Sequence, residues 1–270
     1  MSRGSEKRFF GVVMNRWRVG NLHFSESIYP PGARIKRHVH RHSYFSILLH
    51  GAYHETYGAS VRECEPATAL LHPAGESHED RFSEQGGRIF RFEIADTGSD
   101  LSLARQISNP AELRNGRVRC LAARLCGECR KSDHFSSFAA ESLAWEIVSE
   151  ATRSGTMRQE SGDPRWLTQA IELLHESLPS NLTIERLART VDVHPVHLAR
   201  VFRQRYGLSI GEYARNWRLE VASRALATSA RSIAEVAAVA GFADQSHLSR
   251  TLKTESGITP KEFRAIFRAR

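Results

Sequence analysis

The sequence predicts an α+β multidomain protein: an N-terminal β-barrel, a helical hairpin, and a C-terminal region made entirely of helices. Three observations support this. Short strand-like segments fill the first hundred residues, apolar residues then recur at helical spacing, and a segment near the C-terminus repeats itself. The length of 270 residues fits one large domain or two ordinary ones, and 41% hydrophobic with 25% charged residues excludes a disordered chain.

The composition also excludes several classes of protein. No apolar run approaches the roughly 20 residues that span a bilayer, so we expect no transmembrane helix and no membrane partner. The N-terminus lacks the apolar core and cleavage site of a secretory signal. Four Cys in 270 residues are too few for a disulfide scaffold, so a reducing, cytoplasmic setting is expected.

The barrel is predicted over residues 1–100. Segments 22–29, 44–49, 67–72 and 88–94 are short and rich in aromatic and β-branched residues, and Pro- or Gly-containing clusters, including Gly86 and Gly87, separate them as turns. Many short strands at regular spacing are typical of a barrel or a sandwich.

The hairpin is predicted over residues 101–153, with amphipathic helices at 111–130 and 134–153. Cys126 and Cys129 lie three residues apart on one face of the first helix, with Cys120 nearby. This resembles half of a zinc site or a redox pair, but no second pair follows, so we expect small core residues. Residues 154–163 are polar and aperiodic, which predicts a linker.

Capping signals predict the helices from residue 164 onward. Asp163 precedes Pro164, which suits the first position of a helix, so Asp163 is the expected N-cap. The capping-box spacing, Ser or Thr followed three residues later by Glu, begins at Ser209, Ser232 and Thr259. Glycines at positions 207, 241 and 257 stand where helices should stop.

The C-terminal region contains an internal repeat. His197-Leu198-x-Arg200 recurs 50 residues later as His247-Leu248-x-Arg250, and each copy has the pattern helix, tight turn, helix, with the turn at position 192 or 241. A long helix over about 211–228 lies between the copies. Such helix-turn-helix patterns can place their second helix in the DNA major groove. A helical repeat that binds protein is the alternative.

The distribution of charge favours DNA over protein as the partner. Residues 164–270 carry 16 Lys and Arg against 10 Asp and Glu, whereas the first 163 residues carry 22 against 20. The predicted partner is therefore double-stranded DNA. Arg203 and Lys253, one turn beyond the repeated Arg, are expected to contact phosphate.

Residues 164–270 resemble the DNA-binding domain of the AraC/XylS family of bacterial transcription regulators. The matching motifs are Tyr213-x4-Arg218-Leu219-x2-Ala222, Ile233-x2-Val236-Ala237-x3-Gly241-Phe242 and Gly257-x-Thr259-Pro260-x2-Phe263-Arg264. The resemblance implies that base edges are read by Val196, Ala199, Arg200, Gln245, Ser246, Ser249 and Arg250. It also implies promoter DNA as the target, a hairpin that forms a homodimer, and RNA polymerase as a candidate partner.

The chemistry of these residues agrees with that division. Arg can bond guanine twice and Gln can bond adenine twice, while Val196 and Ala199 could touch only a thymine methyl. Arg200 and Arg250 could instead hold phosphate or a structural carboxylate. His197 and His247 either contact phosphate or pack, and packing is favoured.

Histidines are concentrated in the predicted barrel. Gly32-x5-His38-x-His40 and Pro73-x-Gly75-x2-His78 resemble the two motifs of the cupin family, whose metal site they would form. Residues two apart in a strand face one side, so His38 and His40 should point together. The sequence departs from the cupin pattern where Tyr44 replaces the usual Glu and Phe82 the later Asn or His.

Two uses of these histidines stay open. His38, His40 and His78 could bind a divalent metal such as Zn, Fe or Ni. They could equally line a pocket for an organic effector, or merely pack. Arg34, His42 and Tyr44 are further pocket candidates.

The predicted function is an effector-sensing, DNA-binding transcription regulator that is not an enzyme, with no catalytic residue assigned. One alternative is a metal-dependent cupin enzyme whose helical domain tethers it to DNA; the missing Glu counts against it. Another is a constitutive DNA-binding regulator whose barrel binds no small molecule.

Overall fold

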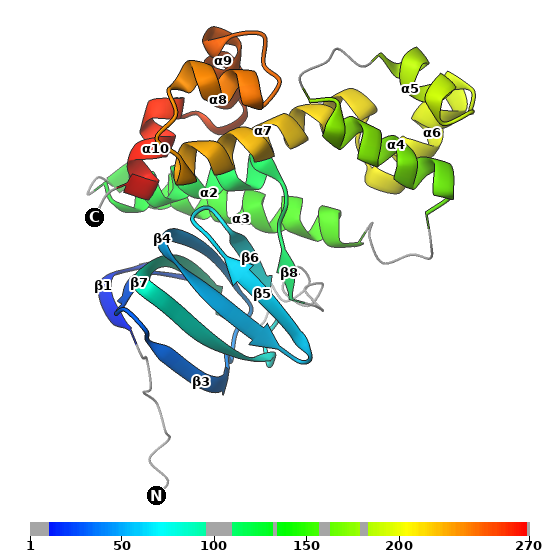
Figure 1. The fold of residues 1–270 in the computed structure, drawn as a ribbon. Coiled ribbons are helices and arrows are strands. Elements are labelled where there is room, and N and C mark those ends of the chain that lie inside the picture. Colours follow the sequence, from blue (N-terminus) through cyan, green and yellow to red (C-terminus); the bar gives the residue numbers. More distant parts are fainter. Residues whose placement is uncertain (1–10, 96–109, 132–133, 157–162, 179–182, 269–270) are drawn as a thin grey trace, which may run out of the picture. The chain divides into compact units, whose positions relative to one another are not determined.

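The computed structural model describes residues 11–95, 110–131, 134–156, 163–178 and 183–268 (Figure 1). The chain divides into two compact units, residues 1–110 and 111–269. None of the described helices combines the length and apolar character that a bilayer-spanning segment needs.

The first unit is an antiparallel sheet with strand order β1-β2-β7-β4-β6, in which β3 also pairs with β7 and β5 with β4. The long β4 and β7 pair over most of their length, and β2 and β3 pair with successive parts of β7. The strands are β1 (Val12–Val19), β2 (Leu22–Tyr29), β3 (Arg34–Val39), β4 (Tyr44–Tyr57), β5 (Ser60–Cys64), β6 (Ala69–His72) and β7 (Ser77–Ile94).

The prediction of a turn at Gly86 and Gly87 is wrong, because β7 runs through both residues. Gly51 on β4 and Gly86 on β7 both have positive φ, and a Cβ on Gly51 would lie 2.0 Å from the carbonyl oxygen of Gly86. The β4–β7 register shifts beside Gly51. These glycines thus permit an irregularity between two long strands at a close backbone approach.

Aromatic residues form much of the core of this sheet. The Phe82 ring stacks on Tyr29 at a centroid distance of 4.4 Å and on Tyr53 at 5.1 Å. Phe82 is 2% exposed. It therefore packs in the core at the position where the cupin pattern has a polar residue.

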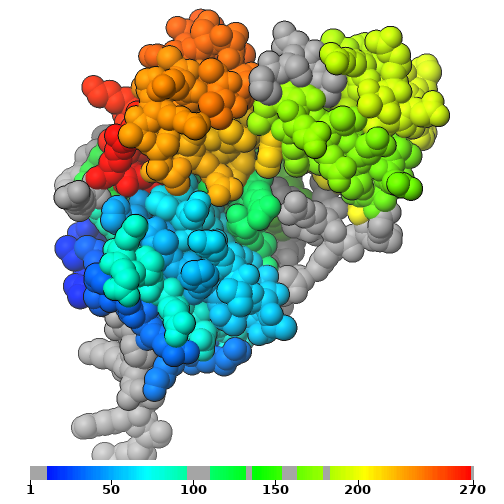
Figure 2. Space-filling model, viewed as in Figure 1, coloured from blue at the N-terminus to red at the C-terminus, as the bar shows by residue number. Residues whose placement is uncertain are grey.

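The second unit contains a short strand and nine described helices, one of which, α7, connects two helical lobes. They are β8 (Ala111–Glu112), α2 (Gly116–Cys129), α3 (His134–Thr156), α4 (Arg165–Glu176), α5 (Ile184–Thr190), α6 (Pro195–Tyr206), α7 (Ile210–Thr228), α8 (Ile233–Val239), α9 (Gln245–Ser256) and α10 (Pro260–Arg268). Helices α4–α6 form the first lobe, whose core includes Leu187, Leu198 and Phe202. Helices α8–α10 form the second lobe, and the two lobes lie toward opposite ends of α7 (Figure 1). Figure 2 shows the second lobe in orange and the first lobe in yellow-green.

Helix α2 begins five residues later than predicted. The Asn115 side chain accepts hydrogen bonds from the backbone N–H of Arg117 and Val118 and so caps the helix at that point. Cys120, Cys126 and Cys129 are buried and unbridged, as expected for core residues.

Most predicted caps are confirmed, with one correction. Capping boxes start α7 at Ser209 and α8 at Ser232, and Thr259 makes the same reciprocal bonds with Glu262. Asp163 does not cap α4, because its carboxylate instead accepts hydrogen bonds from Arg205 and Tyr206 of α6. Within the predicted linker, α3 continues to residue 156, and residues 157–162 lie outside the described part of the chain.

The hairpin packs on the second lobe. Helix α2 contacts α7, α9 and α10 (Figure 1). A Cβ on Gly116 would lie 2.2 Å from the backbone nitrogen of Glu220, so only glycine allows α2 to approach α7 this closely. Next to this contact, Arg119 forms an ion pair with Glu220 at 2.7 Å, and both side chains are almost fully buried.

Candidate nucleic-acid interface and histidine cluster

Helix α6 exposes the first set of predicted DNA-reading residues. Pro195 occupies its first turn, and the His194 side chain accepts the backbone N–H of Val196, which fixes where the helix starts. Leu198 and Phe202 turn into the first lobe. The opposite face presents Val196, Arg200 and Arg203 to solvent, with Ala199 half-buried beside them.

Helix α9 repeats this arrangement in the second lobe. Asp244 caps it by accepting the backbone N–H of His247 at 2.7 Å, and Leu248 and Leu252 are buried. The outer face carries the remaining predicted DNA-contacting residues, exposed except for a half-buried Ser249: Gln245, Ser246, Ser249, Arg250 and Lys253.

The repeated histidines pack. The His197 ring lies 5.5 Å from that of Trp166, and the His247 ring lies 5.2 Å from that of Phe242. Arg200 Nη2 lies 3.3 Å from His197 Nδ1. His197 is exposed and His247 half-buried, so each ring packs at the edge of its helix against an aromatic neighbour.

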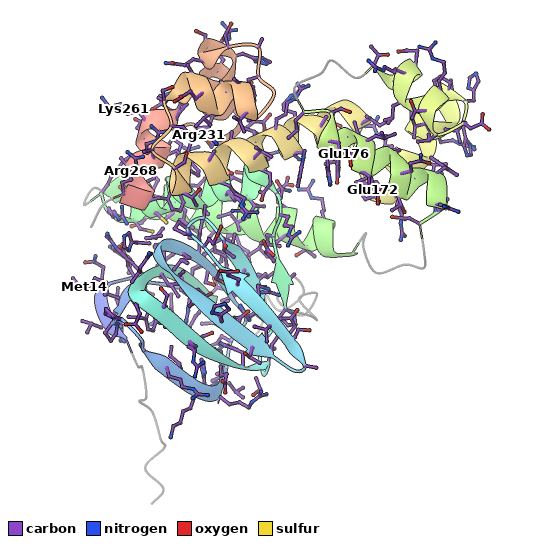
Figure 3. All side chains as sticks on the ribbon, in the orientation of Figure 1. Met14, Glu172, Glu176, Arg231, Lys261 and Arg268 are labelled. Carbon is purple, nitrogen blue, oxygen red and sulfur yellow. The ribbon has the colours of Figure 1, made fainter. Side chains whose placement is uncertain are left out.

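Two arginines of the second unit donate side-chain hydrogen bonds to backbone carbonyls. Arg264 donates to the carbonyl of Arg231 at 2.6 Å, and Arg268 donates to that of Ser229 at 2.8 Å. Figure 3 shows Arg231, Lys261 and Arg268 gathered around α10. Arg264, the arginine of the most C-terminal motif, therefore links α10 to the segment before α8.

In the first unit the structure brings together His38, His40, Tyr44 and His78. The Nε2 atoms of His38 and His40 lie 3.1 Å apart, and the His78 ring centroid is 4.3 Å from that of His38. The Tyr44 hydroxyl lies 3.1 Å from His78 Nε2. His38 lies on β3, His40 follows the end of β3 directly, Tyr44 begins β4, and His78 lies on β7. Strands β3 and β7 pair at His38 and His78.

A carboxylate orients His78. Its Nδ1–H donates to Glu76 at 2.9 Å, which leaves Nε2 as the acceptor for the Tyr44 hydroxyl or for a metal ion. Burial lowers the pKa of His78 to about 4 and also lowers the pKa values of His38 and His40, so all three rings are neutral near pH 7. Neutral imidazole is the form that binds metal.

Sequence analysis missed a charged network behind this cluster. His72 is 1% exposed and lies between Glu55, at 3.2 Å, and Glu76, at 3.1 Å. Burial opposes its charged form, but the two carboxylates raise the pKa of His72 above its ordinary value. Glu55 also pairs with Arg62 at 3.1 Å. The position of His72 just before the Pro73-x-Gly75-x2-His78 motif was the available signal.

Two further buried charges adjoin the network. Burial, with the nearby charge of Glu55, raises the pKa of Asp80 to about 7. The Arg91 guanidinium lies 4.6 Å from the centroid of the Tyr44 ring, a cation–π distance. Burial raises the pKa of the Tyr44 hydroxyl well above its usual value, so it stays protonated.

The histidine nitrogens fit a metal ion. One ligand nitrogen from each of His38, His40 and His78 lies within 4.8 Å of the others. Nitrogens bound to one tetrahedral zinc at about 2.0–2.1 Å would be about 3.3 Å apart, close to the His38–His40 separation. With Glu76 fixing one ring, the set has the supported geometry that metal sites need.

Two predicted pocket residues lie apart from the cluster. Arg34 is exposed and pairs with Glu79 at 3.6 Å. His42 is half-exposed and makes no hydrogen bond or ring contact within the described ranges.

Comparisons with known proteins match the helical unit. Residues 187–266 match the model of a helix-turn-helix domain. The chain is 30% identical over 140 residues to the HTH-type transcriptional regulator ArgR of Pseudomonas aeruginosa, which covers 49% of this chain and 42% of the relative. It is 37% identical over 86 residues to the arabinose operon regulatory protein of Escherichia coli, which covers 32% of this chain and 30% of the relative.

Among solved structures, the AraC-type DNA-binding domain of a Chromobacterium violaceum regulator is 30% identical, with a TM-score of 0.36, over 38% of this chain and 92% of that one. The chain spans less than half the length of the two curated relatives named above. Residues 187–266 therefore form a helix-turn-helix domain, in the region where the sequence motifs predicted one.

Proposed function

We propose that this protein is a transcription regulator that binds promoter DNA through two helix-turn-helix units, α5–α6 and α8–α9. One observation carries the proposal: the repeated Arg200 and Arg250 lie on corresponding exposed faces of α6 and α9, whose opposite faces are buried in separate lobes. Two corresponding exposed helix faces on one scaffold suit two segments of the same DNA groove.

The connecting helix supports this interpretation. Helix α7 has 19 residues, which at 1.5 Å per residue makes it roughly 28 Å long. Successive major-groove segments on one side of B-DNA are roughly 34–36 Å apart. A rigid helix of this length can therefore hold α6 and α9 at a spacing comparable to one helical turn of DNA.

Selection from a random duplex library with the full-length protein tests the proposal. We expect an enriched site with two short conserved segments about one helical turn apart, bound with an affinity that falls steeply with salt. Arg200→Ala and Arg250→Ala should each relax one segment and leave the other intact. A library without any enriched sequence would contradict the proposal, as would a site indifferent to both substitutions.

We further propose that the first unit is a cupin-like sensory barrel and that its histidine cluster binds the signal. The cluster combines neutral imidazoles with a buried charged network, which suits a divalent metal or a small polar effector. Calorimetric titration of the protein with Zn²⁺ distinguishes a metal from an organic effector. Binding lost in His38→Ala and His78→Ala indicates a metal, whereas no binding leaves an organic effector as the occupant.

Association of the chain with itself is part of the same proposal. Phe138 of α3, in the predicted hairpin, is 65% exposed. A hairpin-mediated homodimer would cover it. Light scattering of the wild type and Phe138→Ser should then show a dimer that weakens on substitution.

A further inference from the structure

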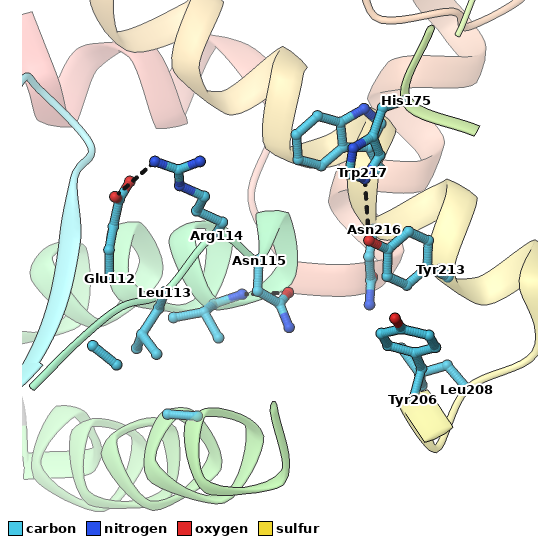
Figure 4. Close-up of a pocket in the computed structure, with 13 residues that line it drawn as sticks. Glu112, Leu113, Arg114, Asn115, His175, Tyr206, Leu208, Tyr213, Asn216 and Trp217 are labelled. Carbon is cyan, nitrogen blue, oxygen red and sulfur yellow. Dashed lines mark hydrogen bonds and ion pairs between the residues drawn. The ribbon is translucent and has the colours of Figure 1, made fainter. Parts of the chain in front are cut away.

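The helical unit contains a cavity of about 260 Å³ (Figure 4). One wall comes from the start of the hairpin and from Ala151 of α3. The other wall comes from α4, from the end of α6 and from α7. It is thus bounded on one side by the hairpin and on the other by the first helix-turn-helix lobe and its connecting helix.

The location follows from how the unit is assembled. Helix α2 packs on α7, α9 and α10, where Gly116 and the Arg119–Glu220 pair hold it tightly. Among the described residues, neither hairpin helix makes an extensive contact with α4, α5 or α6. The cavity lies where this second contact is missing.

The lobe side of the cavity is aromatic and already organised. The His175 ring stacks on Trp217 at 3.8 Å, and its Nε2 lies 3.1 Å from the Tyr213 hydroxyl (Figure 4). Tyr206 lies edge-on to Tyr213 with its hydroxyl bonded to Asp163. Aromatic rings that are already held in place by their neighbours lose little conformational entropy when they bind a planar ligand.

The polar groups of the cavity are uncharged or already paired. Asn216 of α7 and Asn115 of the hairpin contribute amides from opposite walls. Asn115 uses its oxygen to cap α2, which leaves its NH₂ group as a donor. Arg114 is paired with Glu112 at 3.2 Å. The site therefore offers amide hydrogen bonds and no net charge.

We propose that this cavity is a second small-molecule site, separate from the histidine cluster, for a planar, uncharged aromatic compound that carries an amide or carbonyl group. The ring lies against Trp217 and Tyr213, and the polar group bonds Asn216 and Asn115. The ligand bridges the hairpin and the first lobe.

This bridging gives the site a regulatory consequence, which rests on the proposed DNA-binding function. The hairpin is fixed to the second lobe and hence to α9, whereas α6 belongs to the first lobe. A ligand that joins hairpin and first lobe restricts the spacing of α6 and α9. It therefore changes DNA affinity only if it binds the DNA-competent arrangement and the alternatives unequally.

Protein-observed NMR with benzamide as the probe tests the binding itself. We expect saturable shifts of the indole N–H of Trp217 and the side-chain amide of Asn216, with a Kd on the order of 1 mM for so small a molecule. Cyclohexanecarboxamide keeps the amide but is not planar, and benzoate is planar but charged. Each should bind about fivefold to tenfold more weakly.

Two filling variants make the test specific. Asn216→Phe fills the cavity from α7 and Ala151→Leu fills it from α3, so if one fails to fold the other still serves. Asn15→Phe, on the exposed side of β1, is the matched control. Both filling variants should abolish the benzamide shifts, and the control should keep them.

The outcomes separate this site from the proposed function. Absence of saturable shifts in the wild type, or shifts that persist in a folded filling variant, overturns the site whatever the DNA result. Equal binding of all three probes overturns its assigned chemistry. A wild-type protein that shows the benzamide shifts but binds no DNA would instead contradict the DNA-binding proposal and leave the cavity site supported.

Discussion

The buried Arg119–Glu220 pair gives the most demanding prediction. Arg119 is 1% exposed and Glu220 2%, and their charged atoms lie 2.7 Å apart between α2 and α7. Arg119→Met keeps most of the side-chain volume but leaves the Glu220 carboxylate buried without its partner. Breaking such a pair typically costs about 3–5 kcal/mol of folding free energy.

The carboxyl group limits that cost, because it can take up a proton. Burial already raises the pKa of Glu220, and loss of Arg119 raises it further. Keeping a carboxyl group of ordinary pKa near 4.3 protonated at pH 7 costs about 3.7 kcal/mol, at about 1.36 kcal/mol per pH unit. We therefore expect Arg119→Met to cost about 3 kcal/mol at pH 7 and about 1 kcal/mol at pH 5.

Urea unfolding of the wild type and variant at pH 5, 6 and 7 measures this difference. For a unit of this size, the loss at pH 7 should also lower the melting temperature by about 6–12 °C. Adding Glu220→Gln to Arg119→Met should recover most of the loss, because a neutral amide replaces the stranded charge. A cost below about 1 kcal/mol at pH 7, or one independent of pH, would mean that Glu220 does not depend on Arg119 for its buried charge.

Three further predictions use matched substitutions. Gly116→Ala should destabilise the helical unit by about 1–3 kcal/mol in urea unfolding because its Cβ meets the α7 backbone, whereas Gly211→Ala, where a Cβ meets nothing within 4 Å, should be neutral or stabilising. Arg250→Ala should relax preference at one base pair by about 1–3 kcal/mol in competition binding, whereas Lys253→Ala should weaken all sequences alike and reduce the salt slope by about one. In the wild type, the raised pKa of Asp80 makes the folded state bind more protons than the unfolded state, so the stability that protonated Asp80 contributes is full below about pH 4 and is lost toward pH 7. Asp80→Asn should remove this loss of stability with rising pH. The variant should then be the more stable protein at pH 8 by about 2 kcal/mol or more in thermal or urea unfolding.

Each pair has an outcome that would count against it. Equal effects of the two glycine substitutions would mean that α2 does not approach α7 as described. A uniform affinity loss in Arg250→Ala would assign that residue to phosphate instead of a base. Parallel stability curves for Asp80→Asn and the wild type across pH 4–8 would mean that this carboxyl group is not desolvated.

The start and turn positions of the repeated helical segments could be predicted largely from the sequence. Capping boxes at Ser209 and Ser232, the turn residues at 192 and 241, and the start of α6 at Pro195 are local signals, and the structure places them as expected. The exception at Asp163 is instructive. The Asp163 carboxylate accepts hydrogen bonds from Arg205 and Tyr206, which lie 42 and 43 residues away, instead of capping α4. No local sequence pattern indicates such distant donors.

The histidine cluster was predictable only in part. Alternation along a strand places His38 and His40 on one side, and a motif adds His78. His72 and Glu76 lie in the same short segment as His78, whereas Glu55 reaches them from β4 through the pairing of distant strands. Sequence spacing carries no information about a partner such as Glu55. Arg34 had the right chemistry but lies at an exposed position next to Glu79.

The sequence alone therefore determined the start and turn positions of the repeated helical segments, because caps, turns and apolar period act over a few residues. Only the tertiary structure decided that the hairpin packs on the second lobe, that Gly116 permits this approach, and that a cavity lies beside the first lobe. Those features depend on close packing and paired charges between residues far apart in the chain, where shape decides and local preference does not.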